Sequence, residues 1–131
     1  MRYLQPIFRI AECSEVHSKL QAHFSLNLQE MYDLGKHINN IKNAIRAKQA
    51  PLKVAQTRLE LRSHRPDAEA TRDMPHVRLV QEVSELQNHL GRLHSKLAEA
   101  EEALKMLANT KRELKEDLTV KVTIMMMIIN Y

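Results

Sequence analysis

The sequence predicts an all-α protein in which a polar loop joins two long heptad-patterned helices, as a coiled-coil helical hairpin or as a rod segment. Three observations support this prediction. The 131 residues include only two glycines and no tryptophan, a composition typical of long helices. Apolar residues recur at alternating intervals of four and three in both halves. The stretch RPDAEATRD, residues 65–73, separates the two halves.

The first arm is expected over about residues 8–64. Its seam comprises Leu20, Phe24, Asn27, Met31, Leu34, Ile38, Ile41, Ile45, Lys48, Leu52, Ala55 and Leu59. Asn27 and Lys48 are polar, and polar seam residues commonly set the register of a coiled coil at some cost in stability. Pro51 removes a backbone donor, so a kink or a short break is expected near Gln49 to Pro51. Because the heptad phase continues across Pro51, a bend is favoured over the end of the helix.

The connector is expected over residues 65–75. Pro66 disfavours helix at Arg65, and Pro75 suits the first turn of a following helix. Polar, turn-forming residues are ordinary in such a connector. The composition of residues 65–75 therefore predicts only a loop that connects the two arms, and it does not by itself indicate a binding role.

The second arm is expected over about residues 76–121. Its seam comprises Leu79, Val83, Leu86, Leu90, Leu93, Leu97, Ala100, Leu104, Leu107, Lys111, Leu114 and Leu118. Only Lys111 is not apolar, and the pattern persists for more than five heptads, which predicts a coiled coil. The whole chain, 1–131, is interpreted as a single coiled-coil region. An antiparallel hairpin and a rod in which each arm pairs with other chains both satisfy the seams.

The remaining segment, VTIMMMIINY at 122–131, is apolar but too short to cross a bilayer, which requires about 20 residues. Its high β-propensity and low charge make it a candidate aggregation segment. Val54, Leu61 and Val80 lie near the edges of the seams, where they could contact another chain. Homo- or hetero-oligomers are therefore expected.

The charge distribution favours contact between the two halves. Residues 1–64 carry a net charge of +5 and residues 65–131 a net charge of −1. No basic stripe or arm is present, so a nucleic-acid partner is not expected. The single cysteine, Cys13, excludes an internal disulfide, and no signal peptide is recognised at the start, so an intracellular location is expected.

The titratable residues do not form the pattern of a catalytic or metal site. The seven histidines are His17, His23, His37, His64, His76, His89 and His94. None of them forms an i, i+4 pair or an HExxH motif, so neither zinc nor another cofactor is expected. The acidic run 98–103 is interpreted as a solvated face. The chain also lacks a nucleophile constellation and a phosphate loop, so it is not expected to be an enzyme.

The run PLKVAQTRLELRSHRPDAEATRD, residues 51–73, resembles the signature region of the tektins, which ends in a loop of consensus RPNVELCRD. Similar runs follow in RLVQEVSEL at 78–86, LAEAEEALKML at 97–107 and LKEDLTVK at 114–121. The resemblance extends from about Phe8 to Lys121. It implies the C-terminal portion of a tektin with an atypical C-terminal tail.

The signature loop itself is atypical. Residues that match the family pattern are Arg65, Pro66, Glu69, Arg72 and Asp73. Residues that replace the usual Asn, Val, Leu and Cys are Asp67, Ala68, Ala70 and Thr71. An interaction loop is predicted at Arg65, Pro66, Asp67, Glu69, Arg72 and Asp73. Its alternating charges suit an orientation-dependent polar contact between rods or with tubulin.

The function that the resemblance implies is structural. Tektins form filaments associated with doublet microtubules in the axonemes of cilia and flagella, which implies tubulin and other tektin chains as partners. The resemblance also implies a contribution to doublet stability and to the assembly and motility of cilia or sperm flagella. The alternative is a soluble helical-hairpin adaptor that binds a partner helix without a filament role.

Overall fold

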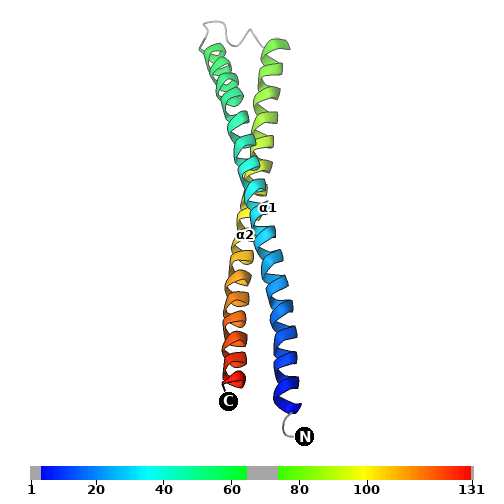
Figure 1. Ribbon diagram of the computed structural model, residues 1–131. Helices are drawn as coiled ribbons and strands as arrows, with labels where there is room; N and C mark the ends of the chain where they lie inside the picture. The colour runs from blue at the N-terminus through cyan, green and yellow to red at the C-terminus, as the bar shows by residue number, and fades with distance from the viewer. Residues whose placement is uncertain (1–3, 65–73, 131) are drawn as a thin grey trace. The chain divides into compact units, whose positions relative to one another are not determined.

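The residues that the structure describes form two long helices (Figure 1). The structure, a computed structural model, describes residues 4–64 and 74–130. Helix α1 spans Leu4–Ser63 and helix α2 spans Met74–Ile129. Within the described ranges only His64 and Asn130 lie outside these helices, and no strand occurs there. The prediction of an all-α fold is confirmed.

Helix α1 continues without interruption through Pro51. Pro51 and Ala47, four residues earlier, are both exposed. The carbonyl group of Ala47, which the proline ring leaves without its helical N–H partner, can therefore be hydrated. The expected short break does not occur, in agreement with the heptad phase that continues across this position.

Hydrogen bonds to the preceding turn are present at the end of α1 beside the connector. The Ser63 hydroxyl donates a hydrogen bond to the Leu59 carbonyl oxygen over 3.0 Å, and the His64 backbone N–H donates to the Glu60 carbonyl oxygen over 3.3 Å. Helix α2 begins at Met74, so Pro75 lies in the first turn, where a missing N–H costs little. The helix begins two residues before the boundary expected from the sequence, a difference typical of helix ends.

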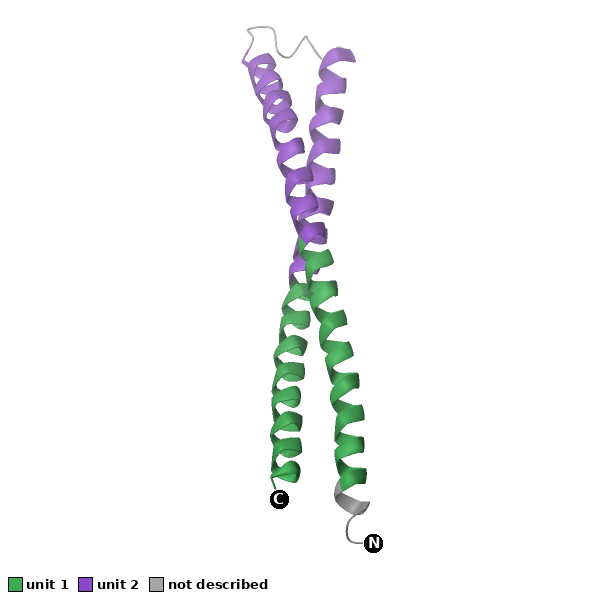
Figure 2. Cartoon of the chain, in the orientation of Figure 1, with its two compact units in different colours: residues 1–35, 102–131 green, residues 36–101 purple. Residues whose placement is uncertain are grey.

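The chain forms two compact units, each made from one segment of α1 and one segment of α2 (Figure 2). Unit 1 comprises residues 1–35 and 102–131, and unit 2 comprises residues 36–101. The buried apolar residues among those described all belong to unit 2: Ile38, Ile41, Ile45, Ala55, Leu90 and Ala100. In unit 1 the buried residue is polar, Asn27. The two units therefore differ in the chemistry of their most buried positions.

The predicted seams are confirmed along both helices. Every seam residue expected from the sequence is buried or half-buried. The pattern also extends further, through Ile10, Cys13, His17 and Arg62 on α1 and through His76, Lys121, Met125 and Ile128 on α2. Several of these additional positions hold polar residues, which explains why an apolar count alone ends the seams too early.

The two seams are mirror images in sequence. Each seam position on α1 has a counterpart on α2, and the two residue numbers add up to 138. Ile10 and Ile128 are one such pair. Contacts between the helices agree with antiparallel pairing, since Asn27 contacts Leu107 in unit 1 and Lys48 contacts His89 in unit 2. Of the two arrangements that the sequence allowed, the protein adopts the helical hairpin.

The C-terminal segment continues helix α2 up to Ile129. Met125 and Ile128 are half-buried at the next seam positions after Lys121. The β-propensity of VTIMMMIIN is therefore overridden by helical pairing in the folded chain. Neither helix is long and apolar enough, over the residues the structure describes, to cross a membrane.

Candidate interaction surface

The predicted interaction loop lies outside the described residues. This applies to Arg65, Pro66, Asp67, Glu69, Arg72 and Asp73. The structure does define the two helix ends that flank the loop, at Ser63 and Met74, and both belong to unit 2. These ends and the neighbouring turns are the part of the candidate site that can be described.

Exposed apolar side chains lie close to these ends. Val54 and Leu61, seven residues apart on one face of α1, are 50% and 65% exposed, and Val80 on α2 is 45% exposed. Met74 and Val77 are exposed as well. The sequence singled out the first three as contacts for another chain, and the structure leaves all of them accessible. Exposed apolar side chains are therefore present on both helices in the turns near Ser63 and Met74.

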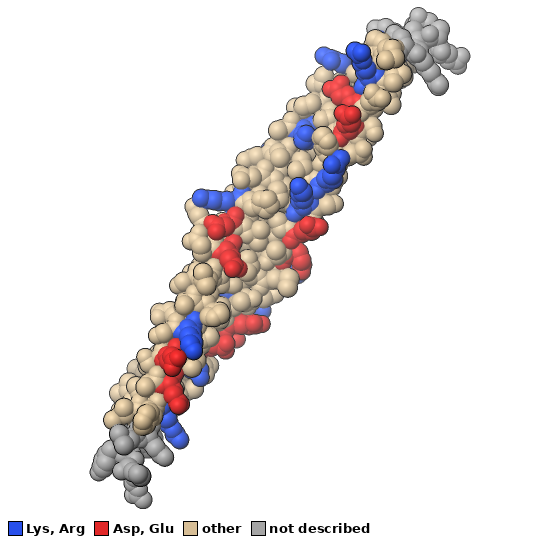
Figure 3. Space-filling view, turned by 90° about the vertical axis from the view of Figure 1, so that its right-hand side faces the viewer, with Lys and Arg blue, Asp and Glu red and all other residues tan. Residues whose placement is uncertain are grey.

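Charged residues of both signs are interspersed over the face shown in Figure 3. The Lys19 ammonium lies 3.3 Å from the Glu15 carboxylate, and the His64 ring lies 4.0 Å from the Glu60 carboxylate. Both pairs are exposed and join residues one turn apart, so each contributes at most about 0.5 kcal/mol. This surface suits a solvated helical protein with many weak polar contacts.

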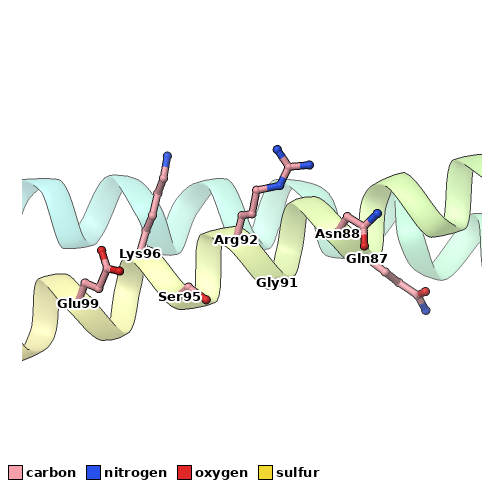
Figure 4. Close-up of a pocket in the computed structure, with 7 residues that line it drawn as sticks. All are labelled: Gln87, Asn88, Gly91, Arg92, Ser95, Lys96 and Glu99. Atoms are coloured by element: carbon pink, nitrogen blue, oxygen red, sulfur yellow. The ribbon is translucent and has the colours of Figure 1, made fainter.

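A shallow depression lies on the outer face of α2 around Gly91 (Figure 4). Its polar lining comprises Gln87, Asn88, Arg92, Ser95, Lys96 and Glu99. A Cβ atom at Gly91 would meet nothing within 4 Å, so the space beside Gly91 is open. The depression is open to solvent and lies on one helix, so it lacks the enclosure that a small-molecule site requires.

Polar groups also occur between the helices. The Asn27 side chain, which is 5% exposed, donates through Nδ2 to the Leu107 carbonyl oxygen over 3.2 Å, whereas its Oδ1 atom has no hydrogen-bond partner. In unit 2 the Lys48 Nζ atom lies 3.1 Å from His89 Nδ1. The lysine is the donor in this pair, because an ammonium group has no acceptor.

The histidines and carboxylates are dispersed. His17 and His76 are half-buried on the seams, whereas His23, His37, His64, His89 and His94 are exposed. The carboxylates of the acidic run, Glu99, Glu101 and Glu102, are exposed too. Among the residues described, no group of three or more His, Cys, Asp or Glu side chains could hold a metal ion.

Half of the eight seam residues that the sequence reasoning missed are polar. His17, Arg62, His76 and Lys121 follow the alternating spacing but do not count as apolar. The signal that could have identified them is the phase of the heptad itself, extended in both directions regardless of residue type. Their positions mark the seam as a mixed apolar and polar interface.

Comparisons with known proteins give the family. The tektin family matches residues 8–126. Tektin-4 of Bos taurus is 44% identical over 113 residues, which cover 86% of this chain and 25% of that protein. Tektin-4 of Homo sapiens is 43% identical over 110 residues, which cover 84% of this chain and 25% of that protein. The chain thus spans about a quarter of the length of these curated relatives.

The matched range includes most of both helices and the whole connector, and it extends five residues beyond Lys121. Tektin-4 of Xenopus laevis is similar to the same extent, with 42% identity over 113 residues. The resemblance noted in the sequence is thereby confirmed, and this chain belongs to the tektin family.

Proposed function

We propose that this chain is a structural coiled-coil component of ciliary and flagellar axonemes, where it associates with doublet microtubules. Its partners in this proposal are tubulin and other tektin chains, and its location is the axonemal cytoskeleton. Family membership and the two long paired helices support the proposal. In this role the protein stabilises the doublet and contributes to the assembly and motility of the cilium or sperm flagellum.

The observation that carries the proposal is the pairing of the two seams within one chain. A helical hairpin with sixteen seam positions on each helix gives a stiff element whose outward faces remain available for neighbours. The adaptor alternative needs a seam that is free to bind a partner helix. The half-buried or buried state of the seam residues therefore favours the filament role.

In the proposal, the loop at residues 65–73 sets axial position. A heptad stripe repeats every seven residues and cannot define one site along a filament, whereas a loop of unique sequence can. Arg65, Glu69, Arg72 and Asp73 would supply charge-assisted hydrogen bonds to a neighbouring rod or to tubulin. The exposed Val54, Leu61 and Val80 would add apolar contact beside it.

Expression of a tagged chain in ciliated cells tests the proposal. The filament role predicts that most of the protein stays with doublet microtubules after detergent removes the membrane and the soluble matrix. Leu90→Asp, which places a charge at a buried seam position, should abolish this retention, whereas Arg92→Asp on the exposed face should not. Complete extraction of the unaltered chain into the soluble fraction would support the adaptor alternative.

A further inference from the structure

Polar residues on the two seams lie at mirror positions. His17 on α1 is the counterpart of Lys121 on α2, and Asn27 is the counterpart of Lys111. Near the connector, Arg62 is the counterpart of His76. Of the polar seam residues, only Lys48 has an apolar counterpart, Leu90. Independent placement of polar residues on two seams would rarely align three pairs in this way.

The contacts between the helices agree with this register. Asn27 donates to the carbonyl oxygen of Leu107, and a helical carbonyl group points toward the residue four positions later, which is Lys111. The Asn27 side chain is therefore level with the turn that contains its mirror residue. Because both seams keep the same alternating spacing, the register indicated by the Asn27 contact implies that His17 is level with Lys121 in unit 1.

The paired groups are chemically complementary. The Asn27 Oδ1 atom is a buried acceptor without a partner, and the Lys111 ammonium carries three N–H donors. A neutral histidine ring likewise accepts a hydrogen bond from a lysine, as His89 does from Lys48 across the helices. Groups that can form hydrogen bonds with each other therefore lie at mirror positions of the two seams.

Any slip by one heptad destroys this complementarity. Asn27 would then face Leu104 or Leu118, and Lys111 would face Leu20 or Leu34. In the same slips His17 would face Leu114 or Ile128, and Lys121 would face Ile10 or Phe24. The apolar residues, in contrast, are nearly interchangeable from one heptad to the next, so they discriminate poorly between registers.

We infer that the mirrored polar pairs His17–Lys121, Asn27–Lys111 and Arg62–His76 specify the register of the hairpin and the identity of the helix that each seam accepts. Parallel in-register pairing of α2 with α2 of a second copy would oppose Lys111 to Lys111 and Lys121 to Lys121. Like charges at facing positions destabilise such a pair. The polar pairs therefore select α1 with α2 in one alignment. This inference concerns the hairpin itself and does not depend on the proposed axonemal role.

Disulfide formation between one cysteine on α1 and one cysteine on α2 reports the register of the hairpin. Cys13 and a cysteine from Met125→Cys occupy mirror positions, so they should form an intramolecular disulfide in the unaltered background. A cysteine from Leu118→Cys reports a one-heptad slip with Cys13. For the opposite slip, Leu20→Cys is combined with Met125→Cys in a Cys13→Ala chain. Intramolecular and intermolecular products are separated by size.

The central comparison replaces two polar pairs with leucine, through His17→Leu, Asn27→Leu, Lys111→Leu and Lys121→Leu. We expect the ratio of slipped to mirror disulfides to rise about tenfold or more, equivalent to ~1.4 kcal/mol. Lys105→Leu, at an exposed position outside the seam, is the control, and the ratio should stay unchanged. An unchanged ratio in the leucine variant, with helical content retained, would overturn the inference.

A charge exchange keeps the test decisive if the leucine variant does not fold. The double variant Asn27→Lys with Lys111→Asn restores a complementary pair and should keep the mirror disulfide. Asn27→Lys alone opposes two lysines. It should therefore favour the disulfide of the slipped register or intermolecular disulfides between helices of different chains. Equal disulfide patterns in the single and double variants would also overturn the inference.

Discussion

Asn27 donates a hydrogen bond from Nδ2 to the backbone carbonyl oxygen of Leu107 over 3.2 Å, which ties α1 to α2 within unit 1. The donor is buried, and the two residues are 80 positions apart in the sequence. An amide at this site suits a carbonyl partner because its NH₂ group can donate while its oxygen remains available as an acceptor. Substitution of Asn27 therefore affects a hydrogen bond between the helices as well as their packing.

Asn27→Asp should destabilise the hairpin. The substitution removes the donor, and it places a carboxylate beside a carbonyl oxygen in a buried position, where an unpaired charge is costly. We expect the free energy of unfolding at neutral pH to fall by about 1–3 kcal/mol. Chemical denaturation followed by circular dichroism measures it, and Asn88→Asp on the exposed face is the control. Equal stability of the two variants would contradict the assigned hydrogen bond.

Ile41→Ala tests the apolar part of the seam in unit 2. Ile41 is among the most buried apolar residues, and truncation removes three carbon atoms from a packed site. The expected loss in free energy of unfolding is about 2–4 kcal/mol. Val54→Ala, on the exposed face of the same helix, should change stability by no more than about 0.5 kcal/mol. Similar losses in both variants would mean that the seam is not where the helices pack.

Lys48→Leu should stabilise the hairpin. Lys48 lies on the seam opposite an apolar counterpart, and its bond to His89 is exposed and therefore weak. Replacement with leucine adds apolar burial, so we expect the free energy of unfolding to rise by about 0.5–1.5 kcal/mol. The midpoint of thermal unfolding provides the measurement. Lys105→Leu, at an exposed position, serves as the control, and a gain there of the same size would refute the seam assignment.

Two adjacent methionines test the C-terminal part of α2. Met125 is half-buried on the seam, whereas Met126 is 58% exposed. Met125→Lys should lower the thermal midpoint, because it places a charge between the helices. Met126→Lys should leave the midpoint unchanged and reduce aggregation, since it interrupts an exposed apolar run. Deletion of residues after Lys121 is expected to combine both effects. A larger fall in the thermal midpoint for Met126→Lys than for Met125→Lys would mean that Met126 and not Met125 lies on the seam.

The heptad count predicted the two helices and the seam residues from Leu20 to Leu59 and from Leu79 to Leu118. The choice between hairpin and rod could not be made in this way, because a seam defines which face is buried and not which chain covers it. An apolar count does not reach the outer seam positions, because polar residues such as His17 and Lys121 interrupt it. After Lys121 the seam spacing favours helix whereas the β-propensity of VTIMMMIIN favours strand, so the two signals conflict in this segment.

Sequence resemblance located the candidate loop, which physical reasoning alone would have treated as a connector. Loops need polar and turn-forming residues whether or not they bind a partner. The described residues show that the loop connects the ends of two helices. These helices carry the exposed Leu61 and Met74 near those ends. The role of the loop in docking remains a prediction.

Axonemal incorporation of loop variants tests the central claim most directly. Tagged chains with Arg65→Ala and Arg72→Ala are compared with chains that carry Arg92→Ala and Arg112→Ala on exposed helical faces. Each charge-assisted contact at a desolvated interface is worth about 1.5–3 kcal/mol. The loop variant should therefore be retained on doublet microtubules at less than about a tenth of the control level, with unchanged helicity.

Restoration of the family residues through Ala68→Val, Ala70→Leu and Thr71→Cys should raise retention above that of the unaltered chain. Equal retention of the loop variant, the control and the restored chain would contradict the account and reduce the loop to a connector.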